Sequence, residues 1–196
     1  MASNPFSTRF IRPGAIPFLF ADGKSAASLV ERLHEQHWWG QIIGPHGSGK
    51  STLLETLKPE LEAAGRQIVA ITLHQGEHRL PPFERGSLNA TTQLVIDGYE
   101  QLSWWSRWRV KSLCRRYKAG LLVTAHSDVG LPTIYQMQPS RDLAEAVVAR
   151  LVGDDRSIVS TGDIAAAYQA TDGNMRETLF RLYDVFQDKA AQSPAG

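Results

Sequence analysis

The stretch GPHGSGKST, residues 44–52, fits the pattern G-x-x-x-x-G-K-[ST] and decides the fold of the chain. Its glycines permit unusual backbone dihedrals, so that backbone N–H groups can converge on phosphate oxygens. The apolar run GQII before it predicts a buried strand, and the run KSTLLETL after it predicts a helix whose positive end faces the same anions. A strand, this loop and a helix together predict a phosphate-binding loop.

The positions of this loop have distinct expected roles. Lys50 is expected to reach the β and γ phosphates of a nucleotide, and the Ser51 hydroxyl is expected to ligate Mg²⁺. His46 is expected to face solvent as a tolerated residue. The predicted nucleotide-binding set is the whole loop: Gly44, Pro45, His46, Gly47, Ser48, Gly49, Lys50, Ser51 and Thr52.

The run TTQLVIDGYEQL, residues 91–102, supplies a carboxylate at the end of a strand. The apolar triplet at residues 94–96 predicts a buried strand that delivers Asp97 to its carboxyl end. There the side chain can hold a water on a magnesium ion. We therefore expect Ser51 and Asp97 to be the metal-side residues.

Strand-like and helix-like segments alternate along the chain and predict an α/β fold with a parallel sheet. A first helix is expected over residues 25–37, and strands are expected over residues 40–44, 66–74, 92–98, 120–126 and 133–138. Beyond Pro139 the strands stop, and three helices are expected. The expected division is an extended proline-containing arm (1–24), a nucleotide-binding core (25–138), a helical lid (139–190) and a flexible tail (191–196).

Composition excludes several classes of protein. The 196 residues suit one domain with a small helical annex, and a formal net charge of +1 gives no global field toward nucleic acid or membrane. The single cysteine, Cys114, excludes an internal disulfide and fits a reducing compartment. No apolar run reaches the roughly 20 residues of a membrane span. A soluble protein of the cytoplasm is expected.

The pair GPHGSGKS and LVIDG resembles the P-loop NTPases of the additional-strand (ASCE) branch, which includes AAA+ and STAND ATPases. The resemblance covers residues 25–190. It implies a five-stranded parallel sheet of order 5-1-4-3-2 flanked by helices, with a C-terminal helical lid. It also implies ATP as the nucleotide, since no N-K-x-D stretch is present.

One departure from this branch concerns the residue that activates water. Many members carry glutamate directly after the aspartate, but here that position is Gly98. Glu100 is the candidate instead, because DGYEQL resembles the NACHT and STAND pattern. The alternative is a surface glutamate in the first turn of a helix, favoured there by the helix dipole. In that case the protein binds ATP and hydrolyses it slowly.

Further polar residues resemble the nucleotide sensors of AAA+ relatives. LLVTAHSD ends the fourth strand with Thr124 and His126, and strand register decides which of them polarises the water; simple strand-end polarity is the alternative. TDGNMRETLFRLYDVF resembles the sensor-2 segment, which makes Arg176 a candidate to report the γ-phosphate to the lid. The alternative is an exposed arginine at a helix start.

An arginine finger is not evident, because the link SDVGLP holds no arginine. A constitutive, processive hexamer is therefore not expected. Three arginines elsewhere stay open as residues that act in trans: Arg79, Arg85 and Arg141.

The stretch LSWWSRWRVKSLCRRYK, residues 102–118, holds three of the five tryptophans, six basic residues and no acid. At helical spacing it predicts one core face, with Leu102, Val110, Leu113, Cys114 and Tyr117. The opposite face is predicted to carry Trp104, Arg107, Trp108, Lys111, Arg115 and Lys118.

Three alternatives remain for what packs against or binds this aromatic and basic face. The chain's own arm can pack across it with Phe6, Phe18 and Phe20. A protein partner or a second copy can bind it, because Trp and Arg favour binding hot spots. Nucleic acid, including DNA, or an anionic membrane surface is the third alternative. In AAA+ relatives a segment before the phosphate loop contacts adenine, so Phe18 or Phe20 is also a candidate to stack on the base.

Three functions follow from these patterns. The first is an Mg²⁺-ATP-binding ATPase that acts as a nucleotide-dependent switch, with partner contact through the tryptophan-rich helix. The second is a scaffold that binds ATP without hydrolysing it. The third is a small-molecule kinase, which needs a basic lid over a second substrate, but residues 140–155 offer only Arg141 and Arg150.

Overall fold

The computed structural model describes residues 4–20, 23–82, 88–153 and 158–192. The chain forms two compact units. The sheet unit comprises Phe20–Gly44 and Leu53–Met137, and the helical unit comprises Met1–Leu19, Pro45–Thr52 and Gln138–Gly196. Within the described ranges, no helix is long and apolar enough to cross a membrane.

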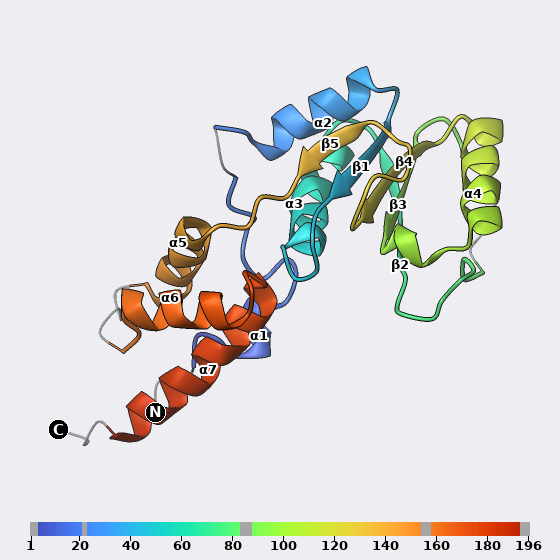
Figure 1. The fold of residues 1–196 in the computed structure, drawn as a ribbon. Helices are drawn as coiled ribbons and strands as arrows, with labels where there is room; N and C mark the ends of the chain where they lie inside the picture. Colours follow the sequence, from blue (N-terminus) through green and yellow to red (C-terminus); the bar gives the residue numbers. More distant parts are fainter. Residues whose placement is uncertain (1–3, 21–22, 83–87, 154–157, 193–196) are drawn as a thin grey trace. The chain divides into compact units, whose positions relative to one another are not determined.

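The sheet unit is built on five parallel strands in the order β2-β3-β4-β1-β5 (Figure 1). This order confirms the one implied by the family resemblance. β1 and β4 are central, so each pairs on both sides, and their residues are largely buried. The strands are β1 (Trp39–Ile43), β2 (Gln67–Thr72), β3 (Thr92–Asp97), β4 (Gly120–Ala125) and β5 (Thr133–Gln136).

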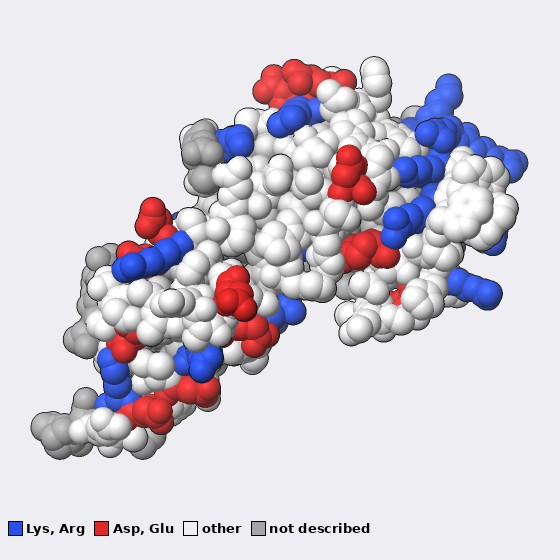
Figure 2. Space-filling view, viewed as in Figure 1, with Lys and Arg blue, Asp and Glu red and all other residues white. Residues whose placement is uncertain are grey.

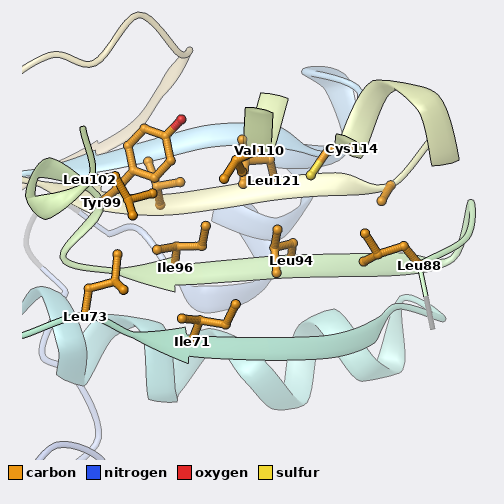
Figure 3. Packing of buried hydrophobic residues seen from close by; sticks show 12 residues of the cluster. Ile71, Leu73, Leu88, Leu94, Ile96, Tyr99, Leu102, Val110, Cys114 and Leu121 are labelled. Carbon is orange, nitrogen blue, oxygen red and sulfur yellow. The ribbon is translucent and has the colours of Figure 1, made fainter. Parts of the chain in front are cut away.

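Helices cover both faces of this sheet. α4 (Trp104–Tyr117) lies on one face, while α2 (Ala26–Glu35) and α3 (Lys50–Ala63) lie on the other (Figure 1). Side chains of a strand alternate between the faces, so Leu94 and Ile96 meet Val110 and Cys114 of α4 in one buried cluster (Figure 3). The helix expected over residues 25–37 ends earlier, because the residues at 37 and 38 adopt positive φ angles of 54° and 67°.

The helical unit holds the C-terminal helices and the N-terminal segment. Its helices are α1 (Thr8–Ile11), α5 (Arg141–Val152), α6 (Thr161–Ala170) and α7 (Met175–Gln192). The three helices expected after Pro139 are therefore present. α7 contributes the expected apolar stripe, because Met175, Leu179, Leu182 and Phe186 are all buried.

The N-terminal arm differs from expectation in two ways. It was expected to be extended, but it contains the single helical turn α1. The expectation that the arm packs over the tryptophan-rich helix is also wrong, because Trp104, Trp105 and Trp108 are exposed. Phe6 is fully buried in the core of the helical unit, with its ring 6.2 Å from that of Phe186. Phe20 lies edge-on to Tyr135 at 6.4 Å.

An ion pair within the helical unit sets an acid-sensitive contribution to stability. Lys189 donates to Asp163 at 2.5 Å, and the Ser160 hydroxyl, in a capping box, donates to the same carboxylate. These hydrogen bonds, the one from Lys189 first, lower the pKa of Asp163 to about 2. Since the folded-state pKa is depressed, this stability is present above the unfolded pKa of about 4 and is lost as pH falls toward 2.

We expect Asp163→Asn to lower the free energy of unfolding at neutral pH by about 1 kcal/mol, the usual cost of a lost cap plus a partly exposed ion pair. The variant should also show a flatter dependence of stability on pH between about pH 4 and about pH 2. Urea unfolding at several pH values measures both effects. Asp184→Asn, an exposed change on α7, is the control. Equal effects of the two variants would contradict this account.

Candidate functional site

The phosphate loop lies between β1 and α3, as the sequence predicts. Gly47 and Gly49 adopt φ angles of 67° and 94°, a region that side chains disfavour. Lys50 is buried, and its ammonium donates to the Pro45 carbonyl at 2.7 Å. The Ser48 hydroxyl donates to the same carbonyl at 2.8 Å. The lysine side chain therefore folds back over the curled loop.

The turn before α7 lies against this loop within the helical unit. An added Cβ at Gly47 would lie 1.8 Å from the Asn174 side-chain oxygen, so a larger residue there would force Asn174 to move. The backbone N–H of Arg176 donates to the Gly47 carbonyl at 3.3 Å, while its side chain is exposed. The structure thus brings Arg176 to the loop. It adds Asn174, which the sequence analysis did not single out although it stands within TDGNMRETLFRLYDVF.

A small cavity of about 80 Å³ adjoins the loop in the same unit. Phe18 lines it together with Gly49 and Thr52 of the loop and with Met175 and Leu179 of α7. Of the two aromatic candidates for contact with a nucleotide base, the structure therefore places Phe18 beside the loop. Phe20 instead packs on Tyr135.

Asp97 stands at the carboxyl end of β3 and is held by β4 in the sheet unit. The Thr124 hydroxyl donates to the Asp97 carboxylate at 2.5 Å and accepts from the Gly98 N–H at 2.9 Å. Thr124 is fully buried, so its hydroxyl is committed to these two partners. Its geometry suits a residue that orients Asp97.

Gly98 occupies a position that leaves little room for a side chain. Its φ is 82°, and an added Cβ would lie 2.7 Å from the Leu73 carbonyl oxygen. Any side chain at this position would meet a backbone oxygen of the neighbouring strand end. The 3-10 turn η2 (Tyr99–Gln101) follows this bend and carries Glu100.

Glu100 faces His126 across the strand ends. The Nε2 of His126 lies 3.1 Å from Oε1 of Glu100. Oε2 of Glu100 is buried and has no hydrogen-bond partner within the described part of the chain. With a side chain only 20% exposed, Glu100 is not a solvated surface residue. Thr124 of β4 and His126, which follows the end of that strand, thus contact Asp97 and Glu100 respectively.

Arg107 and Lys111 of α4 were expected on the outward face, and this is wrong. The Arg107 guanidinium donates to the carbonyls of Leu102 at 2.9 Å and Glu100 at 2.7 Å. These two hydrogen bonds stabilise the turn that carries Glu100. Lys111 donates to the Val129 carbonyl at 3.0 Å. Long cationic side chains can reach inward to carbonyls that a turn leaves without partners.

The comparisons with solved structures agree on one fold. The Walker-type ATPase PABY2304 of Pyrococcus abyssi superposes with a TM-score of 0.61 at 13% identity, over 96% of this chain and 75% of that one. NtrX of Brucella abortus, solved in complex with ADP, gives 0.61 at 12% identity, over 95% of this chain and 55% of that one. The chain shares the fold of these two proteins, which is the P-loop NTPase fold.

This likeness concerns the fold alone, given the low identities. No protein-family model matches the chain, and no curated protein matches it by sequence. The chain spans about half the length of the NtrX structure. Of the three arginines left open as fingers, Arg79 is exposed, Arg141 pairs with Glu145 at 2.8 Å, and Arg85 lies outside the described residues.

Proposed function

We propose that this chain is an Mg²⁺-ATP-binding ATPase that acts as a nucleotide-dependent switch and hydrolyses ATP slowly. The observation that carries the proposal is the pairing at the strand ends. Thr124 of β4 contacts Asp97, and His126, just beyond the end of β4, contacts Glu100, so two carboxylates are kept in separate, defined positions. Such a pair suits one metal-side carboxylate and one base for water.

The loop supplies the phosphate site in this proposal. Its backbone N–H groups and Lys50 neutralise the phosphates, and the start of α3 adds the positive end of a helix dipole. Ser51 and Asp97 are assigned to Mg²⁺ from the sequence pattern, and their hydroxyl and carboxylate oxygens are the donors that this hard cation prefers. When bound, Mg²⁺ neutralises negative charge on the β and γ phosphates.

Glu100 is the proposed base that orients the attacking water. Its buried Oε2 can accept a hydrogen bond, while Oε1 is engaged by His126. His126 thereby orients the carboxylate, and Thr124 does the same for Asp97. Because one oxygen of Glu100 is already committed, and because the glutamate is displaced from the usual position, we expect turnover to be slow.

The switch would operate through the helical unit. The loop, the start of α7 and Phe18 lie together there. A nucleotide bound to the loop would therefore alter the contacts of α7. In this proposal Phe18 contacts the adenine, and the Arg176 guanidinium reports the γ-phosphate. Planar guanidinium groups suit such contacts with phosphate oxygens.

A scaffold that binds ATP without turnover is the second candidate. Gly98 favours it, because the position that usually carries the base has no room for a side chain. The same loop residues would bind the nucleotide, and only the role of Glu100 would differ. A measurement of ATP hydrolysis distinguishes the slow ATPase from the scaffold.

The test measures ATP binding by calorimetry and phosphate release by the full chain with Mg²⁺. We expect Lys50→Ala to weaken ATP binding by about tenfold or more, the usual effect of losing a charged hydrogen-bond donor. Lys58→Ala removes the same charge from the same helix and should leave binding unchanged. Binding without turnover would support the scaffold, and equal effects of the two lysine variants would contradict the phosphate site.

A further inference from the structure

Three tryptophans form a solvent-exposed cluster at the start of α4, which we call the indole surface. Trp104, Trp105 and Trp108 are 64%, 60% and 57% exposed. The rings of Trp104 and Trp105 stack with centroids 4.1 Å apart, and Trp108 meets Trp105 edge-on at 6.4 Å. Contiguous exposed apolar side chains often mark sites of interaction, so we expect the indole surface to bind a partner.

Cations continue from this surface along the same helix. Arg109, Arg115, Arg116 and Lys118 are exposed, and none of the ion pairs within the described ranges involves α4. Figure 2 shows the Lys and Arg side chains gathered in this region of the surface. The helix itself carries no acid, although the whole chain is near neutral. The complementary partner is an anion.

We propose that the indole surface and the four exposed cations of α4 bind single-stranded nucleic acid. A single strand presents an aromatic base and a phosphate at every nucleotide, which matches indoles followed by cations. The 14 residues of α4 run for roughly 20 Å, enough for several nucleotides. A groove beside the helix is lined by Arg79, Trp105 and Arg109, which extends the same combination of charge and ring.

Two other anionic partners fit the surface less well. A helix that lies in a membrane interface buries an apolar face at the acyl boundary, but the aliphatic residues of α4 face the sheet: Val110 is buried there with Cys114. An acidic protein supplies carboxylates for the cations but no ring beside each charge, whereas a single strand supplies a base and a phosphate at every nucleotide. The proposal goes beyond ATP binding and stands without it.

The experiment measures binding of fluorescein-labelled oligo(dT) and oligo(U), each of about 20 nucleotides, by the full chain without ATP. We expect saturable binding whose log K falls with log salt at a slope of about −2 to −3, since four phosphate contacts give about −0.7 each. Trp104→Ala and Trp108→Ala should each weaken binding about tenfold, the usual effect of losing one base-stacking ring.

A pair of charge variants gives an independent readout. Arg115→Ala with Arg116→Ala should reduce the salt slope by about 1. The matched control, Arg150→Ala with Arg181→Ala, removes two exposed arginines of the helical unit and should leave the slope unchanged. Absence of binding at about 50 mM salt, or equal losses in both double variants, would overturn the proposal. So would tighter binding to phosphatidylserine vesicles or to polyglutamate. Because ATP is left out, none of these results depends on the proposed ATPase.

Discussion

Replacing Glu100 with glutamine is expected to lower kcat for ATP hydrolysis by about 10²- to 10⁴-fold and to leave ATP binding intact. Glutamine keeps the size of the side chain but cannot take a proton from water. It also retains an oxygen that can accept from His126, so the 3-10 turn should keep its conformation. Steady-state phosphate release measures the loss, and calorimetry measures the retained affinity for ATP.

The matched control is Glu62→Gln, which removes an exposed carboxylate near the end of α3. If the Glu100→Gln variant hydrolysed ATP at the wild-type rate, this glutamate would only stabilise its turn. Loss of ATP binding together with turnover would show that the substitution disturbs the nucleotide site as a whole. Either result would contradict the role proposed for Glu100.

The second large effect concerns Gly98. We expect Gly98→Ala to lower the free energy of unfolding by about 3 kcal/mol, from the left-handed backbone and from the clash of the new Cβ. That Cβ would lie 2.7 Å from the Leu73 carbonyl oxygen. Leu73 cannot retreat easily, because its own N–H donates to the Asp97 carbonyl at 2.9 Å. Chemical denaturation of the purified variant measures the change.

Gly65 provides a matched control for this prediction. Its φ is 78°, close to the 82° of Gly98, but an added Cβ there would meet nothing within 4 Å. Gly65→Ala should therefore cost only the backbone strain, about 1 kcal/mol. If both variants lose the same stability, the contact with Leu73 does not restrict position 98, and another reason is needed for the displaced glutamate.

Local sequence patterns predicted most of the sheet and the phosphate loop. The glycines, the apolar runs and the periodicity of α7 reflect interactions between residues that are near in sequence, so they can be recognised without coordinates. The strand order came from the family resemblance. The apolar stripe of α7 was predicted correctly because its members recur at helical spacing.

The residues that contact one another at the strand ends could not be assigned in the same way. Whether Thr124 or His126 meets a given carboxylate depends on the register between β3 and β4, and the structure uses both. Arg107 was placed outward because its Cα lies on that side, but its long side chain turns inward to two carbonyls. Asn174 was missed because its partner, Gly47, is far away in sequence.

The bonds from Arg107 to the carbonyls of Glu100 and Leu102 also have a thermodynamic consequence. They connect the turn that carries Glu100 to the helix that carries the indole surface. A nucleic-acid strand bound to α4 and an ATP molecule near the ends of the β-strands would therefore act on the same turn. If bound nucleic acid changes the protein's affinity for ATP by some factor, bound ATP must change the protein's affinity for nucleic acid by that same factor. The affinity of the indole surface for nucleic acid would then depend on which nucleotide is bound to the chain.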